Sequence, residues 1–587
     1  MVFYDFEVFP FDWLVVLVDT DERSETVIVN DPERLKKYFT ERSHGIWVGY
    51  NNRHYDQYIM KAILCDLDPK VVSDKIIKEG KPGWQISDLF KQIQMINYDV
   101  MLNNDGGLKS LEGMMGENIK ETSVPFNINR KLTDDEIQET IEYCRHDVHK
   151  TIDVFMQRKE EFEAVRELIK IFKLPITSFS KTKAQLVAEI CGGMGKRFKD
   201  NEFDFPIVPC LKLKKYRYVL DWYKNPENHD YDKQLDTIVA GVPHTFAWGG
   251  IHGAKPKNMV EGVLLNMDVT AYYPSIQLQY KFGYRNMGKP ENFELIHKEN
   301  LRFKALGDKK ARLPFKIADN SISGQLKDKN SKLYDPMMNN AVCVNGQLML
   351  LMLIEMIEDH AQLIQSNTDG LLIKLNRIED FDLIDDIVYE WEQATGMNME
   401  FELFTKVFQK DVNNYILVNA EGKCKTKGAY VKALSNLDYD LPILNEAVKN
   451  YFLKGIHPAD TINSCNKLKD FQKIVKVSSK YSHALINPKI TEKKIRVDGK
   501  TKPVKVFEGG TIPNEKCFRV FASTRPEDGG IFKVKGDGSN PEKFANTPER
   551  CFIMNENVND VPIPDYLDRQ WYIDTAIKRL EDFGVTL

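Results

Sequence analysis

The sequence lacks several features that would each indicate a particular class of protein. None of its nine cysteines forms a Cys-x-x-Cys pair, which excludes the ligand spacing of the common structural zinc sites. No apolar run approaches the ~20 residues that span a bilayer, since runs such as Trp13 to Val18 and Leu348 to Leu353 are far shorter. The net charge of −5 excludes a uniformly basic coat. We therefore expect reduced thiols, no disulfide, no structural zinc and no membrane contact.

What is present is enough material for several domains. The chain has 587 residues, of which 42% are hydrophobic, so it can fill more than one core. Where a signal peptide would be hydrophobic, the N-terminus carries Asp5 and Glu7, and we expect a soluble cytoplasmic protein. Basic residues gather in three stretches, Lys212–Arg217, Arg302–Lys316 and Lys489–Lys505. Local patches of this kind matter more for phosphate binding than the total charge does.

Acidic and apolar residues alternate in the first strand that the sequence predicts. The chain opens with Met-Val-Phe-Tyr-Asp-Phe-Glu-Val-Phe, and because side chains repeat every second residue, Asp5 and Glu7 share a face. Asp56 follows the next predicted strand, and Asp147 lies on a predicted helix, where Tyr143 shares its face. Two carboxylates side by side favour a divalent metal ion, so we expect a metal site in this segment.

A second pair of acidic stretches lies about a hundred residues apart in the middle of the chain. Asp-Val-Thr-Ala-Tyr-Tyr-Pro-Ser starts at Asp268, and Asn-Thr-Asp-Gly contains Asp369. Each stretch belongs to an apolar, strand-like run, and the tight turn around Asp369 would present it beside Asp268. Paired divalent ions about 3.5–4 Å apart need carboxylates from separate strands, because one ion clamps the attacking oxygen and the other the leaving oxygen. The pattern predicts a two-metal phosphoryl-transfer site.

Residues 292–305 and 309–324 read as an antiparallel pair of helices between these acidic stretches. Lys316 and Asn320 share a face with Arg312, one turn earlier. Cations there suit a triphosphate, because they offset the charge that moves toward pyrophosphate. Further candidates for the same phosphates, on the opposing helix, are Lys298 and Arg302. The alternative is a solvated amphipathic hairpin.

The N-terminal motifs resemble those of the proofreading exonuclease in family B DNA polymerases. Asp-x-Glu, Asn-x-x-Tyr-Asp and Tyr-x-x-x-Asp follow one another in the family's order. The resemblance implies that two metal ions are held by Asp5, Glu7, Asp56 and Asp147 and that Tyr143 orients the attacking water. It also implies DNA contacts at Asn52, Ser110 and Leu111.

The central motifs resemble the polymerase part of the same family. The resemblance implies that Asp268, Val269 and Asp369 bind the metal ions, and that Tyr273 lies beneath the incoming sugar, where its ring would exclude a 2′-hydroxyl. The implied nucleotide contacts are Val269, Tyr273, Lys298, Arg302, Arg312, Lys316 and Asn320, and the implied DNA contacts are Gly249, Gly250, Lys410 and Tyr415.

The sequence departs from the family pattern at a few positions. Asn367 stands where the family usually has aspartate, and Ser323 replaces a tyrosine of the helical-pair motif. Asn413 stands where a lysine would grip the primer strand, and Lys410 is a candidate substitute. The segments on either side of the helical pair leave no room for the long inserts of protein-primed phage members. We therefore expect a compact enzyme that extends a nucleic-acid primer.

The resemblance implies an α/β multidomain fold with an RNase H-like exonuclease domain and a right-hand polymerase of palm, fingers and thumb. The expected boundaries are 1–155 for the exonuclease, 156–260 for a connecting region with a template-binding Gly-Gly turn, 261–291 and 325–440 for the palm, 292–324 for the fingers and 441–587 for the thumb.

The leading hypothesis is a DNA-directed DNA polymerase with 3′–5′ exonuclease activity that replicates DNA, most similar to those of bacteriophages. We expect two Mg²⁺ ions per active site, with Mn²⁺ as a substitute. The expected partners are primer–template DNA, deoxynucleoside triphosphates, and a processivity factor, helicase or single-strand-binding protein. The chain is expected to be a monomer, in the host cytoplasm if it is phage-encoded.

Two alternatives stay open: a dedicated 3′–5′ exonuclease with a decayed polymerase half, and a non-catalytic DNA-binding subunit with a polymerase-like fold. The full set of acids in both sites argues against the second, since a binding module has no need of carboxylates beside phosphates.

Overall fold

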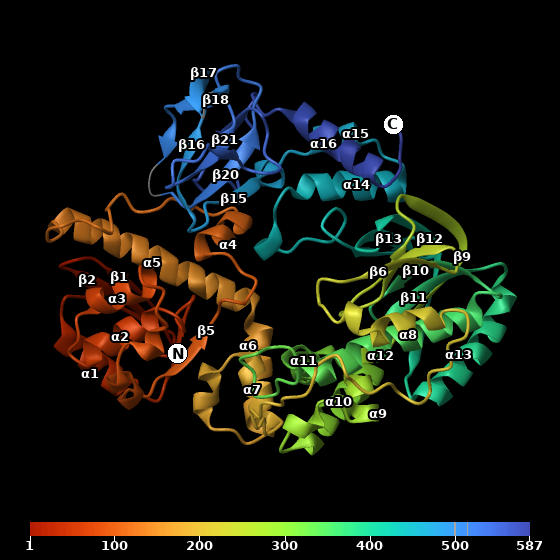
Figure 1. Cartoon of the computed structure of the whole chain (residues 1–587). Helices are drawn as coiled ribbons and strands as arrows, with labels where there is room; N and C mark the ends of the chain where they lie inside the picture. Colours follow the sequence, from red (N-terminus) through yellow and green to blue (C-terminus); the bar gives the residue numbers. More distant parts are fainter. Residues whose placement is uncertain (498–499, 513–514) are drawn as a thin grey trace.

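The computed structural model describes residues 1–497, 500–512 and 515–587. It is a mixed α/β multidomain chain with several sheets. We distinguish an N-terminal part (residues 1–190), a central part (191–440) and a C-terminal part (441–587). In Figure 1 the three parts follow one another around a ring, and the C-terminal part returns to lie on α4 of the N-terminal part.

The N-terminal part is a five-stranded sheet with helices, in the strand order β3-β2-β1-β4-β5. Its strands are β1 (Val2–Val8), β2 (Trp13–Asp19), β3 (Ser24–Val29), β4 (Ile46–Gly49) and β5 (Ile96–Asp99). Its helices are α1 (Pro32–Glu41), α2 (Asp56–Leu64), α3 (Pro69–Ile77), α4 (Leu108–Met115), α5 (Asp134–Gln157), α6 (Lys159–Ile171) and α7 (Lys183–Ile190). Strand β1 pairs antiparallel with β2 and parallel with β4.

The period-two pattern of β1 assigns its two faces. Tyr4 and Phe6 pack with Trp47 in one hydrophobic core, whereas Phe3 packs with Val148 of α5 in another. Because alternate residues point the same way, the side chains that follow Phe3 at positions 5 and 7 also face α5. That helix begins at a capping box, in which the Thr133 hydroxyl accepts from the Glu136 amide at 3.3 Å.

The central part is a nine-stranded sheet in the order β14-β13-β12-β9-β11-β10-β8-β7-β6. Its strands are β6 (Leu235–Val239), β7 (Val242–Phe246), β8 (His252–Ala254), β9 (Asn258–Val269), β10 (Gln362–Asn367), β11 (Gly370–Leu375), β12 (Met399–Asp411), β13 (Asn414–Val418) and β14 (Cys424–Lys427). Its helices are α8 (Arg217–Lys224), α9 (Tyr272–Tyr280), α10 (Pro290–Ala305), α11 (Lys309–Gln325), α12 (Pro336–Ile357) and α13 (Phe381–Thr395). Helices α10 and α11 lie where the sequence predicts a helical pair, and they pack on α6 and α7.

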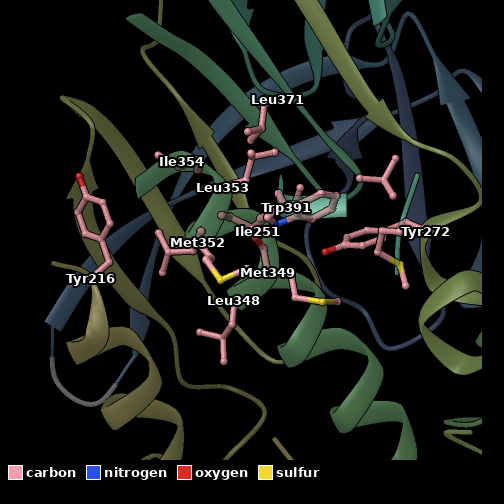
Figure 2. Close-up of a cluster of buried hydrophobic side chains, with 14 of the residues drawn as sticks. Tyr216, Ile251, Tyr272, Leu348, Met349, Met352, Leu353, Ile354, Leu371 and Trp391 are labelled. Carbon is pink, nitrogen blue, oxygen red and sulfur yellow. Dashed lines mark hydrogen bonds between the residues drawn. The ribbon is translucent and has the colours of Figure 1, made fainter. Parts of the chain in front are cut away.

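Helix α12 is the core helix of the central part. By length and composition it could cross a membrane, but 83% of its most apolar window is buried inside the protein. Figure 2 shows Leu348, Met349 and Leu353 of α12 with Leu371 of β11 and Trp391 of α13 in one hydrophobic cluster. The Trp391 indole donates to the Met349 carbonyl at 2.8 Å. Because this cluster covers one face of the sheet, polar side chains of β9 and β11 are left on the other.

The C-terminal part combines three helices with three small sheets. The helices are α14 (Pro442–Lys454), α15 (Pro458–Ser464) and α16 (Arg569–Asp582). The strands are β15 (Lys473–Lys476), β16 (Tyr481–Ile486), β17 (Lys489–Val497), β18 (Lys500–Glu508), β19 (Thr511–Ile512), β20 (Cys517–Ala522), β21 (Ile531–Lys535), β22 (Glu542–Lys543) and β23 (Cys551–Ile553). The basic stretch Lys489–Lys505 forms most of the β17–β18 pair, and its residues 498–499 lie outside the described residues.

A buried arginine links the C-terminal part to the N-terminal part. Arg519 of β20 is fully buried, and its guanidinium donates to the Gly113 carbonyl at 3.2 Å and the Glu117 carbonyl at 2.8 Å in the N-terminal part. Within the C-terminal part it donates to the Gln472 side chain at 3.0 Å and the Glu556 carbonyl at 2.6 Å. Its charge is therefore satisfied by oxygens from both parts at once.

We expect Arg519→Met to lower the free energy of unfolding by about 3 kcal/mol or more, because several buried oxygens lose their donor. Urea unfolding and limited proteolysis of the C-terminal part would measure the loss. The matched change Arg166→Met, at a half-exposed arginine on α6, should stay within about 0.5 kcal/mol. Equal stability of the two variants would contradict a linking role for Arg519.

Candidate active sites

Four acidic residues of the N-terminal part meet between β1 and α5, and we call them the N-terminal carboxylate cluster. Asp5 and Glu7 come from β1, Asp56 is the first residue of α2, and Asp147 comes from α5. The Asp56 carboxylate accepts from the Phe6 amide at 3.2 Å, which ties α2 to β1. The structure thus brings together all four predicted acids, although they span more than a hundred residues of sequence.

These carboxylates are largely removed from water and face one another. Glu7, Asp56 and Asp147 are each less than 10% exposed. Burial, with the Asp56 and Glu7 carboxylates nearby, raises the pKa of Asp5 well above its ordinary value. Burial also raises the pKa of Asp56 to about 7 and that of Asp147 to about 6. A site that resists ionisation in this way favours binding of a counter-charge.

Tyr143 lies next to the cluster, with partners that the sequence did not predict. Its hydroxyl donates to the Glu121 carboxylate at 2.8 Å, and the Lys109 ammonium lies 4.7 Å from its ring centroid. The Lys109 ammonium also donates a hydrogen bond to the Asp147 carboxylate at 2.5 Å. In the sequence, the one indication that Lys109 belongs to this site is its position directly before Ser110 and Leu111, the predicted DNA contacts on α4.

The residues predicted to contact DNA near this cluster have different environments. Asn52 is fully buried, and its amide donates to the Asn97 side chain at 2.9 Å and the Tyr98 carbonyl at 3.2 Å. It therefore fixes the segment before α2. Leu111 packs in the hydrophobic core, while Ser110 is partly exposed and lies beside Cys517 of the C-terminal part.

The second predicted pair of acids lines a cavity of about 400 Å³ in the central part, which we call the central cleft. In the sheet register Asp268 of β9 lies opposite Gly370 of β11 and Glu400 of β12. The Val269 amide donates to the Asp369 carbonyl at 2.8 Å, so the turn that carries Asp369 is tied to the end of β9. An added Cβ at Gly370 would lie 2.5 Å from the Asp268 carboxylate.

Lysines from separate elements share the cleft with these acids. Lys425 of β14 contacts the Asp268 carboxylate at 3.2 Å and that of Glu402 at 3.3 Å. Lys304 of α10 pairs with Glu400, and Lys427 also lines the cleft. These lysines were not among the site residues predicted from the sequence. A signal was present in the alternation Lys-Thr-Lys at 425–427, which puts both lysines on one face of a strand.

The two residues predicted to contact the primer strand, Lys410 and Tyr415, lie in different places. Tyr415 lines the cleft. Lys410 lies 4.5 Å from the Tyr430 ring centroid and 3.3 Å from the Asp411 carboxylate, outside the lining of the cleft. Lys410 was the sequence candidate for gripping the primer strand, whereas the lining of the cleft contains Lys425 and Lys427 instead.

The residues predicted on α10 and α11 to bind the triphosphate are not among the lining residues of the cleft. Lys316, Asn320 and Lys298 are exposed. The other two have protein partners: Arg312 donates to the Asn300 side chain at 2.9 Å, and Arg302 pairs with Glu299 at 2.6 Å. Of the cations on these two described helices, Lys304 lines the cleft.

Tyr273 and the Gly-Gly turn meet beside the cleft. The Tyr273 hydroxyl lies 3.5 Å from the Gly249 carbonyl, and Gly346 of α12 leaves room for the Tyr273 ring. An added Cβ at Gly250 would lie 2.8 Å from the Thr368 side chain, in the turn that carries Asp369. Gly250 thus permits a close approach to the acidic turn, whereas nothing lies within 4 Å of the Cβ position of Gly249.

The three departures from the family pattern have local partners. The Asn367 side chain accepts from the Thr368 amide at 2.9 Å, so it supports the turn that holds Asp369. Ser323 donates to Gln277 of α9 at 2.6 Å. The Asn413 amide donates to the Asp411 carboxylate at 2.8 Å.

Comparisons with known proteins find similarity among solved structures. No family model matches the chain, and no curated protein matches it. Among solved structures, the family B DNA polymerase from the hyperthermophilic archaeon Pyrobaculum calidifontis is similar over 100% of this chain and 78% of that chain, with a TM-score of 0.39 and 12% identity. A likeness of this size is too weak to assign a function to the chain.

We expect Gly370→Ala to destabilise the protein by about 1–3 kcal/mol through overpacking, because the new methyl group would meet both the Asp268 carboxylate and the Met267 carbonyl. Urea unfolding would measure this. Gly536→Ala is the control, since nothing lies within 4 Å of its Cβ position. A Gly370→Ala variant as stable as the control would show that the β9–β11 contact is looser than described.

The N-terminal carboxylate cluster predicts a pH dependence of stability. Because the folded pKa of Asp56 is raised from 3.8 to about 7, the metal-free folded state binds more protons than the unfolded chain between these values. Its free energy of unfolding should therefore fall as pH rises through this range, by at most about 4 kcal/mol for this group.

Thermal unfolding from pH 5 to pH 8 in a chelator would test this, with Asp56→Asn removing the contribution. Bound Mn²⁺ should reduce or reverse the slope, because metal ions compete with protons for the carboxylates. Asp21→Asn, at an exposed acid, is the control. The same slope for wild type and Asp56→Asn would contradict the prediction.

Proposed function

We propose that the chain is a DNA-directed DNA polymerase of family B, of the kind found in bacteriophages, with 3′–5′ exonuclease proofreading. The observation that carries the proposal is the central cleft, where Asp268 of β9 and Asp369 of the β10–β11 turn share a cavity with Lys304, Lys425 and Lys427. A carboxylate pair with cations around it suits the transfer of a phosphoryl group. The N-terminal carboxylate cluster supports the second activity.

On this proposal each expected domain corresponds to particular helices and strands of the structure. The N-terminal sheet with α5 would be the RNase H-like exonuclease, the central sheet the palm, α10 and α11 the fingers, and the C-terminal part the thumb. The β17–β18 pair, which carries the basic stretch, would face a duplex and bind it without regard to sequence.

The donor sets of both sites fit Mg²⁺ or Mn²⁺. Both consist of carboxylate oxygens, which hard divalent cations prefer, and in the N-terminal cluster burial together with the neighbouring carboxylates raises the pKa of Asp5 and Glu7. Asp268 and Asp369, with the Val269 carbonyl, would hold the ions in the cleft. When bound, the ions would lower the pKa of the attacking hydroxyl or water and offset charge on the phosphate.

The protein side chains of the cleft would bind and orient the substrates. Lys304 and Lys427 would contact phosphates of the primer end or the nucleotide, and Lys316, Asn320 and Arg312 would meet the triphosphate when α11 approaches. Tyr273, half-buried against α12 and the Gly249 turn, would present a ring edge to the sugar. A rigid aromatic at this place would disfavour a ribonucleotide.

In the N-terminal cluster the four acids would hold the ions, and Tyr143 would orient the attacking water. The Glu121 carboxylate accepts the Tyr143 hydroxyl proton in a hydrogen bond, which leaves an oxygen lone pair of Tyr143 free for a water. The substrates would be primer–template DNA and deoxynucleoside triphosphates. The proposed location is the cytoplasm, with a monomeric enzyme and separate processivity partners.

The test is a labelled primer on a longer template with Mg²⁺, with and without the four deoxynucleotides. Wild type should extend the primer with nucleotides and shorten it without them. Asp369→Asn should reduce extension at least about a hundredfold while shortening persists, and Asp147→Asn should do the reverse. Glu261→Gln, at an exposed acid elsewhere on β9, should change neither rate.

The outcome also separates the alternatives. Shortening without extension in wild type would make the chain a dedicated 3′–5′ exonuclease with a decayed polymerase half. Binding of the primer–template without either reaction would make it a non-catalytic DNA-binding subunit.

A further inference from the structure

Lys109 is a buried cation that the proposed mechanism does not yet use. It is 8% exposed, and its ammonium contacts the Asp147 carboxylate at 2.5 Å and the Glu112 carboxylate at 3.3 Å. The same ammonium lies 4.7 Å from the ring centroid of Tyr143. One side chain therefore touches both proposed nuclease residues of α5.

The charges around Lys109 are strongly unbalanced. Besides the N-terminal carboxylate cluster, Glu112 is fully buried and one of its oxygens, Oε1, has no hydrogen-bond partner. Its other oxygen also contacts the His146 ring at 3.1 Å. A lone structural ion pair would need one acid, whereas here a single ammonium lies among several buried carboxylates. A buried charge in this setting is stable only because it is paired.

Resting on the proposed nuclease function, we propose that Lys109 is a positioning residue of that site: a fixed cation that holds Asp147 and the Tyr143 ring in place and offsets part of the carboxylate charge. Its bond to one Asp147 oxygen leaves the other oxygen free for a metal ion. Its place over the Tyr143 ring restrains that ring while Glu121 holds the hydroxyl. The carboxylates are thus kept in position before an ion binds.

Helix α4, which carries Lys109, is held from the far end of the sequence. Arg519 donates to the Gly113 and Glu117 carbonyls, the Val558 amide donates to the Gly116 carbonyl at 2.9 Å, and the Ile119 amide donates to the Asn555 carbonyl at 2.8 Å. The helix therefore cannot shift without breaking contacts to the C-terminal part. This anchoring gives Lys109 a defined position.

The proposal predicts opposite changes in two measured quantities. In an Asp369→Asn background, which weakens metal binding in the central cleft, Lys109→Gln should slow primer shortening roughly 10–100-fold, as for other residues that support metal ligands. Mn²⁺ affinity of the N-terminal cluster, measured from the electron paramagnetic resonance signal of free Mn²⁺, should stay equal or increase, because a repelling cation is gone.

Two further variants sharpen the result. Lys109→Arg keeps the charge and should retain Mn²⁺ affinity and at least about a tenth of the shortening rate. Lys150→Gln, on α5 but paired with Asp153 and Glu117, should behave like the parent. Thermal unfolding in a chelator checks that each variant is folded, and Lys109→Gln should be the one that gains most from added Mn²⁺.

Several results would overturn the proposal. Lys109→Gln with an unchanged shortening rate would mean that the lysine is a bystander. A parallel loss of rate and of Mn²⁺ affinity would mean that Lys109 only maintains the fold. If the parent protein neither shortens DNA nor binds Mn²⁺ at the N-terminal cluster, the proposed nuclease function itself fails, and the inference fails with it.

Discussion

The mutual repulsion of carboxylates is the constraint on which both candidate sites depend. Acids that face one another at short range oppose their own ionisation, and they stay together only because packing elsewhere holds their strands and helices in register. In the N-terminal part, apolar residues on alternate positions of β1 fix the strand against α5. In the central part, α12 and α13 cover the apolar face of β9 and β11 and leave Asp268 on the other.

Each site also contains a lysine in contact with one of its proposed metal ligands. Lys109 contacts Asp147 in the N-terminal cluster, and Lys425 contacts Asp268 in the central cleft. The two lysines differ in burial, since Lys109 is almost enclosed whereas the Lys425 side chain is 45% exposed. A buried lysine is held in one place, while a half-exposed one can turn toward a substrate phosphate. On the proposed function, the same kind of contact would position a ligand in one site and bind substrate in the other.

The sequence alone pointed to acids that the fold brings together, but not to the lysines that lie beside them. Asp5, Glu7, Asp268 and Asp369 were accessible because they lie in strands or at a turn, where a period of two or a turn signal fixes their direction. Lys109 and Lys425 were not predicted as site residues, because their relevance depends on how α4 and β14 approach from distant positions.

Asn52 shows that a motif can also predict a contact for a side chain that the fold buries. A motif gave it a DNA contact, but only the folded chain reveals that its amide is fully buried and bonded to Asn97. Arg519 carried no sequence signal, since a single arginine in an apolar strand does not reveal five oxygen partners drawn from distant segments.

The Arg519 link has a consequence for the timing of folding. Its partners Gly113 and Glu117 lie about 400 residues earlier in the chain. At 5–20 residues per second, the ribosome would need roughly 20 to 80 s to cover that distance. Throughout this interval α4 lacks its hydrogen bonds from the C-terminal part. The N-terminal carboxylate cluster then lies beside a helix that is not yet held in place. A nascent chain would thus complete the surroundings of its N-terminal carboxylate cluster only after the segment that forms the central cleft has been made.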